Sequence, residues 1–106
     1  MTDGAWHEVG AAGDEQAGTL RRVDVAERAV CLARTDDGWL AFDDTCTHEE
    51  CPLSDGIVTD AEVECPCHGS IFNMRTGEAL TGPALESVRT YRVRVEDGRI
   101  QVLIAR

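Results

Sequence analysis

The chain has 106 residues and a formal net charge of −10, from 20 acidic and 10 basic side chains. This length suits one domain and is too short for a second catalytic module. The negative charge disfavours nucleic acid and anionic membranes as partners and favours docking to positively charged protein surfaces. No apolar run approaches the length of a membrane span, and the N-terminus has no basic apolar leader, so we expect a soluble, cytoplasmic protein.

The first part of the chain predicts three short strands. Residues 20–25, 29–33 and 39–42 are rich in apolar residues, and polar turn residues separate them. The Asp37-Gly38 pair is a tight-turn signal before the third segment. The period is close to two rather than to 3.6, which favours strands over helices.

The segment after these strands contains two loops that each combine cysteine with histidine. The first reads CTH at residues 46–48 and the second reads CPCH at residues 65–68. Each loop therefore supplies one thiolate and one imidazole that can converge on one metal centre. Structural zinc sites usually place two like ligands in each knuckle, whereas one type of 2Fe-2S centre has two His in place of two Cys on one iron. A zinc site, or core cysteines without a metal, remain as alternatives.

The same loops, in full CTHEECPLSDG and ECPCHGSIF, closely resemble the cluster-binding boxes of Rieske iron-sulfur proteins. The resemblance implies one 2Fe-2S cluster, with Cys46 and Cys65 as thiolate ligands of one iron. It implies His48 and His68 as imidazole ligands of the other iron. Neutral imidazoles in place of thiolates lower the negative charge on the cluster and raise its reduction potential.

The resemblance also implies an architecture. It suggests a single Rieske domain over residues 1–106, with a base of antiparallel strands and a cluster-binding subdomain at about residues 45–83. Residues 57–64 predict a pair of strands inside that subdomain. Beyond it, residues 89–95 alternate, EDGR turns the chain, and residues 100–104 return as a hairpin. No stretch has the period and caps of an amphipathic helix, so the expected fold class is all-β, an antiparallel β-sandwich base that carries two iron-binding loops.

Three positions take an expected role from the resemblance, and a fourth departs from it. Cys51 and Cys67 stand where high-potential Rieske proteins join the two loops by a disulfide, so we expect a bridge although a reducing cytoplasm opposes it. Ser70 matches the family serine whose hydroxyl donates to a bridging sulfide and raises the potential. Phe72 stands where the high-potential members have a tyrosine with a second such hydroxyl, and we expect it to serve in packing.

Residues outside the two loops have simpler interpretations. Cys31 lies within an apolar strand, where a buried core residue is expected. His7 has no ligand partner near it in the sequence and is expected to be structural. Gly82-Pro83 resembles the proline-containing third loop that covers the cluster in Rieske proteins, with an ordinary turn as the alternative.

A lone Rieske domain without a membrane anchor resembles the ferredoxin component of multicomponent oxygenases. Such a protein takes single electrons from a flavoprotein reductase, passes them to a terminal oxygenase, and has no small-molecule substrate of its own. Terminal oxygenases continue into a module whose mononuclear iron is held by two His and a carboxylate. Only His7 lies outside the motifs here, so we do not expect an enzyme. The alternatives are an electron-transfer small subunit of another redox enzyme, such as nitrite reductase, and a metal-stabilised redox-sensing interaction module.

Overall fold

The structure is a computed structural model that describes residues 4–47 and 50–105. One sheet has the order β1-β11-β10, from β1 (Gly4–Ala11), β11 (Arg99–Ala105) and β10 (Val93–Glu96). A second has the order β2-β3-β4-β9, from β2 (Leu20–Val25), β3 (Arg28–Thr35), β4 (Gly38–Asp43) and β9 (Thr90–Tyr91). The third has the order β5-β6-β7-β8, from β5 (Ile57–Thr59), β6 (Glu62–Glu64), β7 (Ile71–Asn73) and β8 (Ala79–Thr81). All strand pairs are antiparallel, which confirms the expected all-β class.

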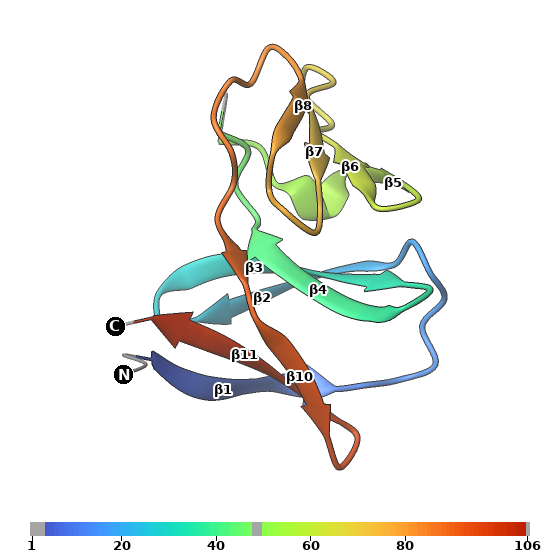
Figure 1. Ribbon diagram of the computed structural model, residues 1–106, viewed down its shortest axis with the longest axis vertical. Helices are drawn as coiled ribbons and strands as arrows, with labels where there is room; N and C mark the ends of the chain where they lie inside the picture. The colour runs from blue at the N-terminus through green and yellow to red at the C-terminus, as the bar shows by residue number, and fades with distance from the viewer. Residues whose placement is uncertain (1–3, 48–49, 106) are drawn as a thin grey trace.

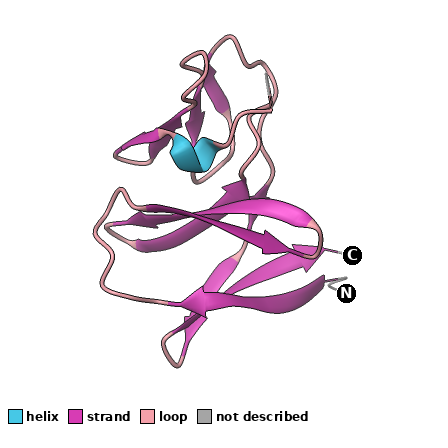
Figure 2. Cartoon of the chain, turned by 180° about the vertical axis from the view of Figure 1, so that it is seen from behind, coloured by secondary structure: helices cyan, strands magenta, loops and turns pink. Residues whose placement is uncertain are grey.

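The first two sheets form the base and the third sheet stands at one end of it (Figure 1). A short 3₁₀ helix, η1 (Leu53–Asp55), lies between the base and the third sheet (Figures 1 and 2). Both cysteine loops belong to the end of the molecule that is built on the third sheet. No helix in the described part of the chain is long and apolar enough to cross a membrane.

The second sheet is buried on both faces because it is shared by two cores. Val30 and Leu32 of β3 pack with Ile100 and Val102 of β11 between the two sheets of the base. The alternate residue Cys31 faces the other way and packs with the core beneath the cysteine loops. A strand that is covered on both sides needs apolar residues at successive positions. This explains why β3 is continuously apolar in its middle instead of alternating.

The predicted strands in the first part of the chain are present, and the expected pair within residues 57–64 is β5 and β6. The segment 89–95, expected as one strand, is divided instead. Thr90–Tyr91 pairs with β4, and Val93–Glu96 pairs with β11. The alternating sequence thus changes from one basal sheet to the other at Arg92, a step that a period of two does not reveal.

Gly56 connects η1 to β5 at a point where the backbone has no room for a side chain. A Cβ on Gly56 would lie 2.1 Å from the Glu64 carbonyl oxygen and 3.0 Å from that of Leu53.

We expect Gly56→Ala to lower the free energy of unfolding by about 1–3 kcal/mol, the usual cost of overpacking. Urea unfolding of the cluster-bound protein measures this loss. Gly82→Ala is the matched control, because a Cβ there meets no heavy atom within 4 Å; equal midpoints for the two variants would contradict the prediction.

Candidate metal centre

The first cysteine loop is closed at its base by backbone contacts. Thr45 and Pro52 form an isolated antiparallel bridge, and the Cys46 N–H donates to the Cys51 carbonyl oxygen over 3.0 Å. Cys46 is buried, with 3% of its surface exposed. His48, expected as an imidazole ligand, lies outside the described residues. The structure therefore places the thiol of this loop but not its histidine.

Asp44 holds this loop to the base. Its N–H donates to the Ala29 carbonyl oxygen over 3.0 Å, and its own carbonyl oxygen accepts the Leu53 N–H over 2.6 Å. Its buried carboxylate accepts the Ser54 N–H over 2.7 Å. No role for Asp44 was predicted from the sequence. Its position two residues before Cys46 could have indicated this role, since Asp side chains often accept backbone N–H groups in turns.

The second cysteine loop turns tightly between β6 and β7. The Cys65 N–H donates to the Ser70 carbonyl oxygen over 2.7 Å, and the Gly69 N–H donates to the Cys65 carbonyl oxygen over 3.2 Å. Gly69 has a φ of +78°, a conformation that favours glycine over other residues. The turn buries Cys65 and leaves His68 exposed. A group bound at this loop would thus have a protein side and a solvent side.

The Cys65 thiol lies among groups that act on its charge in opposite directions. Burial raises its pKa most strongly, and a hydrogen bond shared with the Cys46 thiol raises the pKa further. The backbone N–H groups of Cys67 and His68 point at the sulfur and lower the pKa. Burial outweighs these two N–H donors, so the pKa of the Cys65 thiol is raised overall. The effect of Cys46 on this pKa places the thiols of the two loops near each other.

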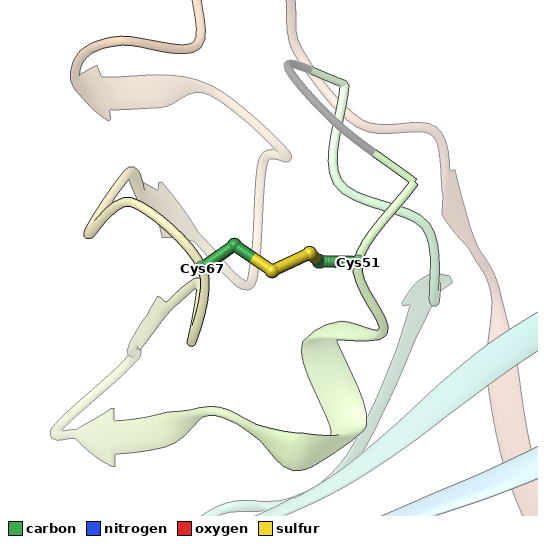
Figure 3. Close-up of a disulfide and its surroundings, with 2 residues drawn as sticks. All are labelled: Cys51 and Cys67. Atoms are coloured by element: carbon green, nitrogen blue, oxygen red, sulfur yellow. A yellow bond between two sulfur atoms is a disulfide. The ribbon is translucent and has the colours of Figure 1, made fainter.

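Cys51 and Cys67 are joined by a disulfide between the two loops (Figure 3). Their Cα atoms are 6.4 Å apart and sixteen positions separate them in the sequence. The Sγ atoms of Cys51, Cys65 and Cys67 all lie within 4.8 Å of one another. The bridge is therefore adjacent to the buried thiols and fixes one loop relative to the other.

A third loop, between β8 and β9, contacts both cysteine loops. Ser70 is buried, and its Oγ accepts the Ala84 N–H over 2.9 Å. The Thr47 hydroxyl donates to the Glu86 carbonyl oxygen over 2.7 Å. A hydroxyl has one proton and two acceptor sites, so accepting the Ala84 N–H leaves the Ser70 O–H able to donate elsewhere. Gly82-Pro83, expected as a covering loop or a turn, lies in this segment.

The residues expected to be structural lie away from the centre or beneath it. His7 is on β1, opposite Val102. Cys31 is fully buried, and burial together with the Asp44 carboxylate raises the pKa of its thiol, which keeps it protonated. Phe72 is fully buried on β7 opposite Val63, so it serves in packing as expected.

The family model of the Rieske [2Fe-2S] domain matches residues 5–92. The chain belongs to the Rieske [2Fe-2S] family. Membership implies a 2Fe-2S cluster, and the donor chemistry of this Rieske domain fits one. Two buried thiols from separate loops lie near each other, and backbone N–H groups point at one of them. A mixed set of thiolates and imidazoles is the ligand type of the Rieske centre.

Relatives with known roles resemble this Rieske domain over nearly its whole length. The ferredoxin CarAc of Metapseudomonas resinovorans is 38% identical, and the match covers 92% of each chain. A chain in the complex of reduced oxygenase and oxidized ferredoxin in carbazole 1,9a-dioxygenase is 37% identical, with a TM-score of 0.85. That match covers 91% of this chain and 99% of the other. A structure from Mycobacterium tuberculosis, assigned as the small subunit of an NADH-dependent nitrite reductase, is 29% identical with a TM-score of 0.85, covering 97% of each chain.

Proposed function

We propose that this chain is the ferredoxin component of a multicomponent oxygenase. It takes electrons one at a time from a flavoprotein reductase and delivers them to a terminal oxygenase. The observation that carries this proposal is the end-to-end similarity to the ferredoxin CarAc, 38% over 92% of both chains. The chain acts as an electron carrier and not as a catalyst by itself. We place it in the cytoplasm, as the sequence led us to expect.

We assign one 2Fe-2S cluster to the chain, with Cys46 and Cys65 on one iron and His48 and His68 on the other. The burial of both thiols and the interaction between them support the cysteine pair. His68 follows Cys65 by three positions in the same tight turn, and His48 follows Cys46 by two positions in the sequence of the first loop. We take about residues 45–83 as the cluster-binding part of a single domain. When bound, the cluster supplies a one-electron couple at a potential above that of an all-cysteine cluster.

The exposed side of His68 supports a route for electrons at the tip of the loops. Cys46 and Cys65 are buried, whereas His68 is exposed. A partner that approaches this tip reaches His68 before the two buried cysteines. We infer that both redox partners dock there in turn, which suits transient complexes that form and separate quickly.

A second candidate is an electron-transfer small subunit of a nitrite reductase. The likeness to the Mycobacterium tuberculosis structure favours it, at 29% identity over 97% of each chain. Both candidates use the same centre and differ in the acceptor. The oxygenase role is preferred because the similarity to the carbazole dioxygenase complex is higher, at 37% identity.

An EPR-monitored redox titration tests the proposed function, with iron and sulfide measured on the same sample. We expect a rhombic signal in the reduced protein, about two iron and two sulfide per chain, and a midpoint potential of about −150 mV. A midpoint above about +100 mV would move the assignment to the high-potential Rieske proteins. The absence of a 2Fe-2S signal would rule the proposal out and return the site to zinc.

The net charge of −10 predicts that salt slows electron transfer to the oxygenase. Raising the ionic strength from about 0.01 M to about 0.1 M shortens the Debye length from about 30 Å to about 10 Å, which weakens steering between opposite charges. We therefore expect the second-order rate of oxygenase reduction in stopped-flow experiments to fall over this range. A rate that stays constant or rises would show that acidic side chains do not guide the encounter.

Leu85 predicts a specific apolar contact in the same complex. It is 92% exposed in the third loop, between Ala84, which donates to Ser70, and Glu86, which accepts from Thr47. We expect Leu85→Ser to raise the apparent KM for oxygenase reduction about fivefold, the effect of about 1 kcal/mol at an interface. The midpoint potential should not change. Val95→Ser is the matched control, because Val95 is also exposed but lies on β10 in the base; an equal effect of both substitutions would contradict the prediction.

A further inference from the structure

Four cysteine sulfurs gather where the two loops meet, although the proposed cluster uses only two of them. The Sγ atoms of Cys51, Cys65 and Cys67 lie within 4.8 Å of one another. Cys46 is not a member of this group, but its thiol interacts with that of Cys65, one of the three. In a tetrahedral zinc site with Zn–S bonds of about 2.3 Å, the sulfurs are about 3.8 Å apart. To reach that geometry, the Cys51 and Cys67 sulfurs must separate after reduction of the bridge, and the Cys46 sulfur must approach them.

The disulfide withholds two of these sulfurs from any metal. Cys67 is exposed and Cys51 is half-buried, so a dithiol can reach the bridge from solvent. Two electrons and two protons convert the Sγ–Sγ bond into two thiols, and the dithiol becomes a disulfide in the same exchange. Both loops remain tied to the third loop, since the Thr47 hydroxyl donates to the Glu86 carbonyl oxygen and Ser70 Oγ accepts the Ala84 N–H, and neither bond involves the bridge.

We propose that the Cys51–Cys67 disulfide decides which metal this centre takes. With the bridge intact, only Cys46 and Cys65 are available as thiolates, and the site accepts the mixed-ligand cluster. With the bridge reduced, Cys46, Cys51, Cys65 and Cys67 bind one zinc ion. Zinc replaces iron on Cys46 and Cys65, the iron and sulfide of the cluster leave to solvent, and Cys51 and Cys67 release their two thiol protons. The inference rests on the proposed function in so far as Cys46 and Cys65 are the cluster thiolates.

Chemistry supports zinc as the competitor. Zinc forms closed four-sulfur sites and is held by thiolates without a preferred electronic geometry. A metal can enter from the exposed Cys67 side, whereas Cys46 and Cys65 form the buried side. Reduction of the bridge thus converts a site with two thiolates into one with four, without a change of fold.

Zinc challenge of the cluster-bound protein tests the inference. The holoprotein is incubated with zinc, with a phosphine reductant, or with both, and metal content is measured after gel filtration. We expect loss of the cluster absorbance and uptake of about one zinc per chain only when both are present. Cobalt in place of zinc should give the absorption of a four-thiolate site. Equal zinc uptake with and without the reductant, or a two-thiolate cobalt spectrum, would overturn the inference.

The double variant Cys51→Ser/Cys67→Ser is the matched control, because it keeps the proposed cluster ligands. With reductant present, its apparent zinc affinity should be lower by more than the roughly 10- to 100-fold that loss of an outer-shell partner costs. Alkylation read by mass spectrometry gives a second result on the wild type, where zinc should protect Cys51 and Cys67 after reduction. Alkylation of both in the zinc-loaded protein would also overturn the inference. These results are distinct from failure of the proposed function, which shows as a missing 2Fe-2S signal in the untreated protein.

Discussion

Replacing His68 by alanine should abolish the rhombic EPR signal of the reduced protein and lower its iron and sulfide content. The reason is that one iron of the proposed cluster would keep only one of its two imidazole ligands, and no neighbouring side chain of equal chemistry replaces the other. Secondary structure should be largely retained, because His68 is exposed at the tip of its turn. EPR, circular dichroism and metal analysis on the same sample separate loss of the cluster from loss of the fold.

His7→Ala is the matched control for this substitution. His7 lies on β1 opposite Val102, in the sheet of the base that is remote in sequence from the cysteine loops. Its removal should leave the EPR signal and the iron content unchanged. An unaltered spectrum in His68→Ala would exclude this residue as a ligand, and an equal loss in both variants would point to unfolding.

His68→Cys gives a more specific form of the same prediction. A third thiolate adds negative charge to the cluster, which favours the oxidised state. Any cluster that assembles in this variant should have a lower midpoint potential, shifted towards the value of about −400 mV that plant-type all-cysteine ferredoxins have. A midpoint equal to that of the wild type would show that residue 68 does not coordinate iron.

The sequence predicted the strands and motifs whose signals are local. Residues 20–25 form β2 with the expected bounds, and residues 57–64 form the expected pair of strands. Each of these segments shows its periodicity and turn residues within about ten positions of sequence. β1, β7 and β8 were not predicted. β1 has a register shift between Glu8 and Gly10, and β7 and β8 have only three residues each, too few for a clear period.

The contacts that position the centre could not be predicted because they join residues distant in the sequence. The bond from Ala84 to Ser70 spans 14 positions, and the bond from Thr47 to Glu86 spans 39. Neither pair carries a pattern of its own. The Cys51–Cys67 pairing was expected from the family resemblance alone, since spacing does not specify which cysteines are joined. Local pattern thus predicted the elements, whereas the three-loop arrangement required the fold.

The disulfide predicts a large effect on stability. Removing it in the double variant Cys51→Ser/Cys67→Ser opens a loop that the bridge closes over sixteen positions. Chain-entropy arguments give about 3 kcal/mol for a loop of this size, because the cross-link restricts the unfolded chain. For a domain of about 100 residues this corresponds to a fall in melting temperature on the order of 15 °C. Calorimetry of the cluster-bound protein measures the fall.

The reduced wild type supplies the internal control for this stability prediction. A phosphine reductant should lower the melting temperature of the wild type to about that of the double variant, and it should leave the variant unchanged. A chelator is included so that zinc cannot occupy the four thiols and stabilise the reduced protein by binding. Equal melting temperatures for oxidised wild type and variant would show that the bridge contributes nothing to the native state. If the expected fall is observed, the disulfide stabilises the fold by fixing the two loops. By our inference it also keeps the centre available to iron. Reduction would therefore lower the stability and change the metal preference together.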